Sequence, residues 1–595
     1  MASDSVIYEE LHTEGASLSG ARTGGDFQAS SLVNTEFDFN SSSASQSSST
    51  TSVLELFGIH LEDLETESTE EVVEALISGG NSVLVSALEA ETQSGSTSVG
   101  GEATTTTSFD VVGVGGNQAT TETAASGSLI SDVGFDLSDS AESTHGHASL
   151  ITEDSRISGS DFDQISAGAN WVTTSDVAAS LVGTAESAFG HADTATEIKE
   201  ILGSSTAELL VKGSSKLDSN ADVSLSYTSN SQSGDASSTT DLLQLLGLEI
   251  DGAATNDYSA EIGGYLELDA DTRAAIDELA NSESGDALTT SIIQDAGGIS
   301  LGDSATGAGF DAEANVDLSI EQSSRSKGGD ASASNTITES VAIEADSQLL
   351  SNGDTAIKAN QDILFNQSSQ TIQGDSKTLS IGDTQVGIEL GTLESGDQIQ
   401  LVVNNFLGGE STATSVLATA STEEIQNYIA GLEAESINAG TTLSTQADTS
   451  LSFDGQSVSD KGDATSLGEV VHAYGIDAVS TTGNTVNVDA SASTSLLQLA
   501  ETIEGDAQAI GKLGDQEAIA VSTLLSSGDA KLIANALASL NGDAKSVEGT
   551  AESRSQLSAL LGLNSNTVGI EGDAEILAAI GLNGTNEASS MTGDA

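Results

Sequence analysis

Three oxygen-bearing side chains alternate along one short segment of the sequence, in the pattern Asp218-x-Asn220-x-Asp222. Carboxylate and amide oxygens are the ligands that Ca²⁺ prefers, and the first half of an EF-hand loop has this spacing. Val223 occupies the position of the turn glycine, and the bidentate glutamate of that loop is absent, which excludes an EF-hand. The segment therefore predicts a looser oxygen cage for Ca²⁺, with Asp218, Asn220 and Asp222 as ligands.

A second pair with metal-binding chemistry is His145-Gly-His147. On a β-strand, alternate residues face the same side, so both imidazoles would point the same way. Imidazole nitrogen is a common zinc ligand, although a structural zinc site needs four ligands. The alternative is a pair of exposed polar residues within a Ser-rich repeat, and the sequence leaves both interpretations open.

Motifs of the common enzyme classes are absent from the sequence. Gly511-Lys512 is followed by Leu513, so it is not a phosphate-binding loop, and neither a His-Glu-x-x-His nor a Gly-x-Ser-x-Gly motif occurs. Aromatic residues make up only 3% of the chain, whereas sugar clefts normally use stacking rings. Trp171, the single tryptophan, is expected to anchor a core or an interface. The sequence predicts a protein that is not an enzyme and has no organic cofactor.

The charge balance excludes several partners. The 595 residues include 15 basic and 92 acidic side chains, for a net charge of −77. Such a surface repels phosphate, which argues against nucleic acid and against anionic membranes. Carboxylates at this density also repel one another, and divalent cations would relieve that repulsion. The absence of Cys excludes disulfides and thiolate metal sites.

Internal similarity is the strongest signal in the sequence. An apolar-polar-apolar triplet is followed by alternating Ser and then by Gly-Asp-Ala or a variant of it, and the copies are 98, 88, 93 and 135 residues apart; they begin at Phe37, Phe135, Val223, Val316 and Leu451. Period-two alternation predicts β-strands with one apolar face. Gly-Asp is typical of the turns that follow strands.

A second repeated unit predicts short helices. Apolar residues at i, i+3 and i+4 precede a glycine, as they do on a short buried helix with a left-handed stop. The five copies are Val53–Gly58, Ile198–Gly203, Leu242–Gly247, Leu557–Gly562 and Ile576–Gly581.

These patterns predict a mainly β, elongated repeat architecture with short interspersed helices. Two forms remain open, a β-solenoid and a row of β-sandwich modules. The unit boundaries that follow from the spacing are 1–36 as an N-terminal segment and possible assembly strand, then 37–130, 131–220, 221–312 and 313–447, with 448–595 as a fifth unit plus a helix-rich C-terminal region.

In composition, the whole chain resembles the acidic, Cys-free bacterial surface proteins that type I systems export without a cleaved leader. The resemblance implies an extracellular or cell-surface location without an N-terminal signal peptide, and the sequence begins without a basic and apolar leader pattern. The calcium-binding nonapeptide of that family, Gly-Gly-x-Gly-x-Asp, does not occur.

The leading functional hypothesis is a non-enzymatic structural protein that self-assembles into an extracellular filament, sheath or surface layer. A chain with no Pro offers every backbone N–H to a β-ladder. The strand that carries Phe37 and Phe39 would complete the sheet of a neighbouring copy, or else is the first strand of its own domain. Alternatives are a secreted repeat adhesin that binds glycans or surfaces, and a β-solenoid polysaccharide-degrading enzyme.

Overall fold

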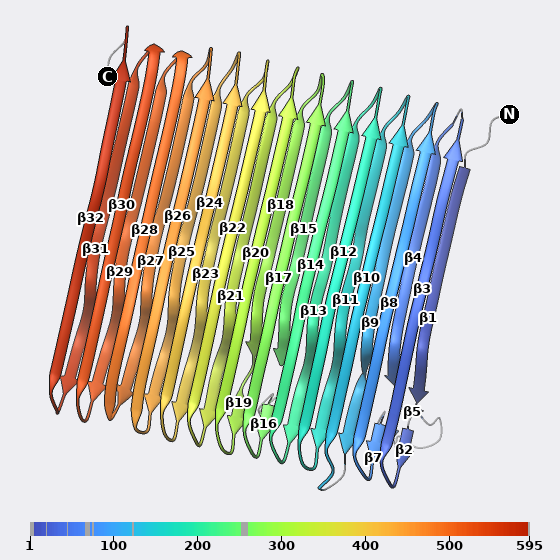
Figure 1. Ribbon diagram of the computed structural model, residues 1–595, viewed down its shortest axis with the longest axis vertical. Coiled ribbons are helices and arrows are strands. Elements are labelled where there is room, and N and C mark those ends of the chain that lie inside the picture. Colours follow the sequence, from blue (N-terminus) through green and yellow to red (C-terminus); the bar gives the residue numbers. More distant parts are fainter. Residues whose placement is uncertain are drawn as a thin grey trace.

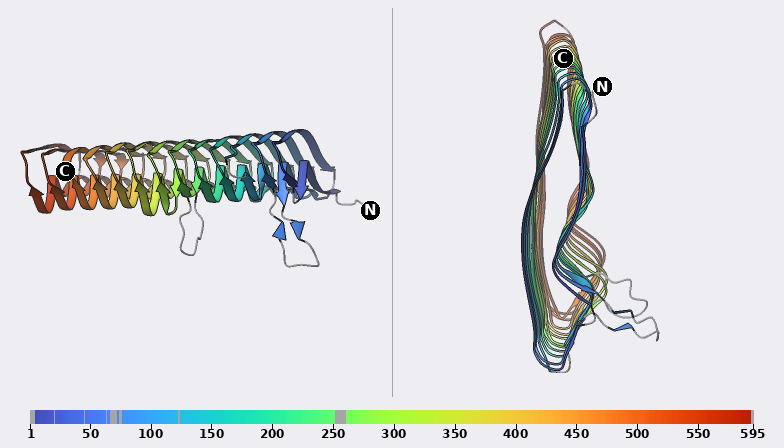
Figure 2. Two further views of the ribbon diagram at one scale, coloured as in Figure 1. Left: turned by 90° about the horizontal axis from the view of Figure 1, so that it is seen from below. Right: turned by 90° about the vertical axis from the view of Figure 1, so that its right-hand side faces the viewer.

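The computed structural model describes residues 5–19, 21–44, 46–62, 64–65, 72–73, 76–121, 124–250 and 260–592, and every regular element in them is a β-strand. The strands stack side by side into a flat slab of two layers (Figure 1 and Figure 2). Viewed along the stacking direction, the chain encloses a narrow interior between two sheets (Figure 2, right). This is a β-solenoid, one of the two architectures that the sequence allowed.

One sheet, called the straight sheet, has 13 parallel strands. Its strands are β3 (Phe27–Ser43), β8 (Ser82–Ser98), β10 (Gly127–Ser143), β12 (Trp171–Ser187), β14 (Ser215–Ser231), β17 (Leu266–Ser282), β20 (Phe310–Ser326), β22 (Thr355–Thr371), β24 (Ile399–Ser415), β26 (Thr442–Ser459), β28 (Thr485–Glu504), β30 (Ala530–Glu548) and β32 (Ala574–Ser590).

The opposite sheet, called the bent sheet, has 17 strands, four of them short. Its strands are β1 (Ser5–Ser19), β2 (Ala21–Thr23), β4 (Ser48–Glu62), β7 (Leu76–Ser78), β9 (Ala103–Thr121), β11 (Ala148–Ala167), β13 (Ala192–Val211), β15 (Ala236–Ile250), β16 (Ala260–Ile262), β18 (Ala287–Leu301), β19 (Ser304–Thr306), β21 (Ala331–Ser351), β23 (Ser376–Ser395), β25 (Ala420–Ala439), β27 (Ala464–Gly483), β29 (Ala507–Ser526) and β31 (Ala551–Ile570). A separate antiparallel pair consists of β5 (Leu64–Glu65) and β6 (Val72–Val73).

One strand of each sheet makes one coil, and successive coils are in register. Gly127 of β10 pairs with Trp171 of β12, and the pairing continues residue by residue to Ser143 and Ser187, always 44 positions apart. The 88 residues between Phe135 and Val223 therefore span two coils, so the spacing in the sequence was about twice the structural repeat. The unit boundaries expected at 37, 131, 221, 313 and 448 fall inside strands of the straight sheet, and the structural unit is the single coil.

The interior is filled by every second side chain of each strand. In β10, alternate residues from Gly127 to Ser143 are buried, and their neighbours point outward. Trp171 is fully buried, as expected of a core anchor, and a Cβ on Gly127 would lie 1.9 Å from its ring. Glycine at this position therefore leaves the space that the indole of the next coil fills.

The expected helices are strands, and the bend explains the error for the segments in the bent sheet; the segment 576–581 lies in β32 of the straight sheet. In β15, Leu243 and Gln244 both lie on the outer side, and the next four residues, Leu245–Leu248, are all buried. Leu242 and Leu245 join the main core, but Leu246 does not. The break in alternation thus imitates helical i, i+3, i+4 spacing, and the two flanking strands override the helix propensity of Leu.

The four other segments, 53–58, 198–203, 557–562 and 576–581, lie in β4, β13, β31 and β32, so neither the short helices nor the helix-rich C-terminal region is present. None of the described residues forms a helix that could span a membrane.

Candidate functional site

The edge where strands of the straight sheet turn into strands of the bent sheet, called the turn edge, carries a repeated motif. In most coils, the last or nearly last residue of the strand is Ser or Thr, and a Gly follows three residues later. Ser326 Oγ donates to the carbonyl oxygen of Gly285 in the preceding coil at 2.7 Å, and it accepts the N–H of Gly329 at 2.8 Å. Each hydroxyl therefore closes its own turn and ties it to its neighbour.

The residue after that Gly extends the tie. Asp330 Oδ1 accepts the backbone N–H of Asp375 at 2.8 Å, and Asp286 Oδ1 accepts the N–H of Asp330 at 2.9 Å. Carboxylates of successive coils thereby form a row spaced by roughly 4.8 Å, the distance between neighbouring strands. The Gly-Asp turns expected from the sequence are present, and their acids bond between coils.

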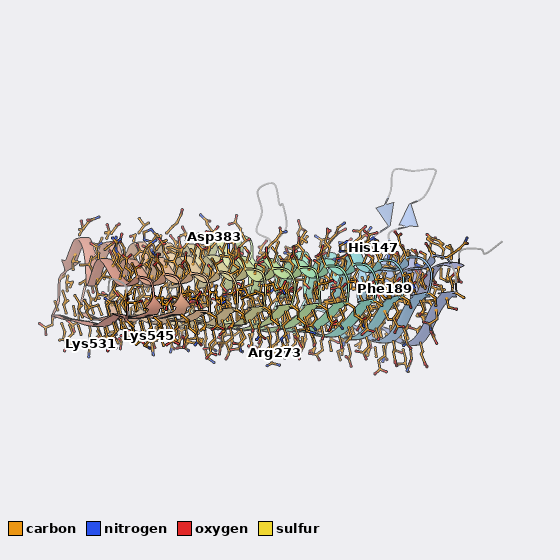
Figure 3. All side chains as sticks on the ribbon, turned by 90° about the horizontal axis from the view of Figure 1, so that it is seen from above. His147, Phe189, Arg273, Asp383, Lys531 and Lys545 are labelled. Atoms are coloured by element: carbon orange, nitrogen blue, oxygen red, sulfur yellow. The ribbon has the colours of Figure 1, made fainter. Side chains whose placement is uncertain are left out.

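His145 and His147 lie in one of these turns and not on a strand. The ring of His145 stacks on Phe189 at 5.1 Å, while that of His147 stacks on His191 at 4.8 Å. His147 Nδ1 accepts the backbone N–H of His191 at 3.0 Å, so His147 takes the place of Asp in the row. The structure thus directs the two expected ligands to different partners. Figure 3 labels His147 and Phe189 near the turn edge.

A groove of about 720 Å³ runs across the coils beside the turn edge. Its lining is mostly hydroxyl, amide and carboxylate side chains, with Arg325 and Lys327 toward its C-terminal side. Asn281 donates to Asn230 Oδ1 at 2.9 Å, which orders the amides in a row along the groove. This arrangement presents repeated donors and acceptors to a linear polar ligand.

Asp218, Asn220 and Asp222 project from the outer face of β14. Alternate residues of a strand are about 6.6 Å apart, so three of them cannot converge on an ion whose ligands lie about 2.4 Å away. Asn220 donates instead to Asp176 Oδ1 of the neighbouring strand at 2.7 Å. In the part of the chain that the structure describes, no group of three or more His, Asp or Glu side chains is placed to hold a metal ion. The three side chains thus do not converge on one point, and Ca²⁺ binding by this acidic surface stays a prediction.

Phe37 and Phe39 lie on β3, which pairs in parallel with β8 of the same chain. Their rings are 6.0 Å apart and pack partly buried against the main core. The strand is thus the first described strand of its own sheet, as the simpler of the two interpretations predicted.

Acids also lie inside the solenoid, which the sequence did not predict. Asp139, Glu278 and Glu424 are at most 3% exposed. Burial raises the pKa of Asp139 to about 7 and those of Glu278 and Glu424 to about 8. Glu278 Oε2 accepts hydrogen bonds from Ser291 Oγ and Gln322 Nε2, both at 2.9 Å. These acids lie among the buried Ser, Thr and Gln side chains of the interior.

Two sequence signals for these features were present. The triplets Gly146-His147-Ala148 and Gly190-His191-Ala192 are 44 residues apart, which pairs their imidazoles in adjacent coils. Likewise, Gln322 stands 44 residues after Glu278.

Comparison of the chain with protein-family models, with curated proteins and with solved structures found no match.

Proposed function

We propose that this chain is a non-enzymatic structural protein that stacks coil on coil into an extracellular filament, sheath or surface layer. One observation carries the proposal. Neighbouring coils are joined by interactions that each further coil repeats, namely two main-chain ladders and the side-chain ties of the turn edge. A coil from a second copy can add to such a stack with the same contacts.

The outermost strands of the straight sheet supply the surfaces for this addition. Among the described residues, β3 pairs only with β8, and β32 pairs only with β30. Ile580 of β32 pairs with Ala536 of β30, which occupies an inward position. The side chain of Ile580 is nevertheless 57% exposed. Covering such a side chain with another coil contributes about 1.5–3 kcal/mol.

Negative-stain microscopy and sedimentation of residues 1–595 test the proposal. We expect filaments whose width equals that of one solenoid, and we expect Ile580→Lys to abolish them because it places a charge where the next coil would stack. Leu577→Lys is the matched control, since Leu577 is 50% exposed on the outer face of the same strand. Unassembled single molecules at every protein concentration, or filaments that persist in Ile580→Lys, would contradict the proposal.

A second candidate function, an adhesin that binds glycans, is favoured by the polar groove beside the turn edge. Its row of amides and hydroxyls suits the repeated hydroxyl groups of a linear polysaccharide. Asn281→Ala should weaken binding on a glycan array if this groove is the site. Unchanged binding in that variant would exclude the groove.

A further inference from the structure

The outer surface of the bent sheet contains a second apolar strip. Val341, Val386 and Ala430 are at most 4% exposed, yet they form a cluster separate from the main core, with Tyr428 and Tyr474 packed against it. All of them except Tyr428 occupy one row across successive coils, since Val341 pairs with Val386, Val386 with Ala430 and Ala430 with Tyr474. The strip lies where the bent sheet bends (Figure 2, right), and it is called the floor of the outer crease, the surface formed by this row and its neighbouring rows.

Acidic rows flank this floor on both sides. The row before it contains Arg156, Glu200, Gln244, Asp295, Glu339, Thr384, Tyr428, His472 and Asp515, and the row after it contains Asp161, Ser205, Glu249, Ser300, Glu344, Glu389, Glu433, Asp477 and Ala520. Arg156 is the one Lys or Arg in these two rows. The outer crease therefore combines an apolar floor with walls of negative charge.

Arg156 places a guanidinium group of the chain itself on this surface. Its guanidinium lies 2.8 Å from Asp161 in the second row and 2.7 Å from Glu200 in the first row of the next coil. The side chain thus extends along the floor and contacts carboxylates of both walls. Planar guanidinium with several N–H donors is well matched to such paired carboxylates.

Farther along the crease, a cavity of about 220 Å³ has no Lys or Arg among the described residues that line it. Its Asp477 comes from the row after the floor, and its Glu517 belongs to the floor row, where it pairs with Tyr474. Tyr474, Asp477, Glu517 and Asn564 line it. Glu517 is 7% exposed, and its Oε2 has no hydrogen-bond partner among the described residues, while Oε1 accepts from Asn564 at 3.2 Å. A buried carboxylate oxygen without a donor is costly, and turning the side chain toward a cationic donor in the cavity would remove that cost.

We propose that this cavity binds an arginine side chain of a basic, extended polypeptide. Asp477 and Glu517 receive the guanidinium, the ring of Tyr474 offers it an aromatic surface, and the apolar floor accepts the aliphatic part of the side chain. The partner is a different protein from this chain, which is itself poor in basic residues.

The test must separate this site from the general attraction of a chain with net charge −77. A fluorescent peptide of nine arginines is titrated by anisotropy at 150 mM NaCl, a concentration that screens exposed charges beyond about 8 Å. We expect the double variant Asp477→Asn, Glu517→Gln to bind at least tenfold more weakly. The control Asp277→Asn, Glu321→Gln removes equal charge from the outer face of the straight sheet and should change the affinity less than twofold.

Two further measurements distinguish binding at this cavity from attraction by diffuse charge. Ala520→Arg places a guanidinium beside the cavity from within the chain, as Arg156 does elsewhere, and should block the peptide while the thermal midpoint stays equal or rises. A nine-citrulline peptide, which is neutral, should not bind. Equal weakening in the site and control variants, or full binding by Ala520→Arg, would show that the peptide is held by diffuse charge alone and would overturn the proposal.

Discussion

The acids of the turn edge and the acids of the interior are the same residue types in opposite surroundings. Asp330 is exposed and accepts a backbone N–H from the next coil, whereas Glu278 is fully buried among Ser and Gln side chains. A backbone N–H lowers the pKa of Asp506 at the turn edge, and burial raises the pKa of Glu278 in the interior. Net charge alone therefore does not describe how this chain responds to pH.

As pH rises, Asp506 at the turn edge and the acids of the interior should therefore change the stability of the fold in opposite directions. At the turn edge, the N–H of Thr550 lowers the pKa of Asp506, so its contribution is present above the pKa of the unfolded chain and is lost as pH falls through the folded value. In the interior, the raised pKa values of Glu278 and Glu424 mean that the folded chain holds protons that the unfolded chain releases. Stability from these sites decreases between about pH 4.5 and 8.

The largest expected effect comes from neutralising the interior acids. Glu278→Gln with Glu424→Gln should leave stability near pH 4.5 almost unchanged and raise it at pH 9. One pKa unit corresponds to about 1.4 kcal/mol, so each site costs the wild type a few kcal/mol above pH 8. Gln fits the row, because Gln322 occupies the equivalent position in the next coil. Urea unfolding from pH 4.5 to 9 measures the difference.

Glu321→Gln on the outer face of β20 is the control for that experiment, because it removes a charge without changing the interior. Its stability curve should run parallel to that of the wild type across the pH range. If the interior variants also run parallel, the interior acids are ionised in the folded chain at no cost, and the contrast with the turn edge fails.

How far the sequence could predict this fold depends on where alternation holds. In strands of the straight sheet such as β14, buried and outward residues alternate from end to end, so segments such as Val223–Tyr227 were correctly predicted as strands. The bent sheet breaks alternation where its strands turn inward, and there Leu242–Gly247 resembled a helix. The 44-residue period was missed because the most similar triplets, at Phe135 and Val223, lie two coils apart and the intervening coil has Ala179 in their place.

The sites were less predictable than the fold, because they form between residues 44 positions apart. His147 and Asp218 were each compared with neighbours along the chain, whereas their structural partners are His191 and strands on either side. The outer crease needs the bend, which becomes visible only when the strands are stacked. A periodicity search at 44 residues would have found the rows, although not which side of the sheet each faces.

A smaller effect should follow from breaking one tie of the turn edge. Ser326→Ala removes the donor to the Gly285 carbonyl and the acceptor of the Gly329 N–H. Loss of such bonds at a buried site costs about 1–3 kcal/mol. Ser319→Ala, at an exposed position of the same strand, should cost less than about 0.5 kcal/mol. Equal losses in the two variants, measured by urea unfolding at pH 7, would show that the turn hydroxyls do not hold the coils together.

The smallest expected effect separates hydrogen bonding from charge within the turn edge. Asp330→Asn keeps an oxygen to accept the N–H of Asp375, and it relieves repulsion from the carboxylates of Asp286 and Asp375, whereas Asp330→Ala loses the acceptor. We therefore expect Asn to be neutral or slightly stabilising at low salt and Ala to cost about 1 kcal/mol. Since salt screens exposed charges, the gain from Asn should vanish at 1 M NaCl while the loss from Ala persists. If Asn and Ala are equally destabilising at both salt concentrations, the carboxylate of Asp330 contributes through its charge rather than as a hydrogen-bond acceptor. The contrast between the turn edge and the interior would then not rest on the hydrogen bonds of the turn edge.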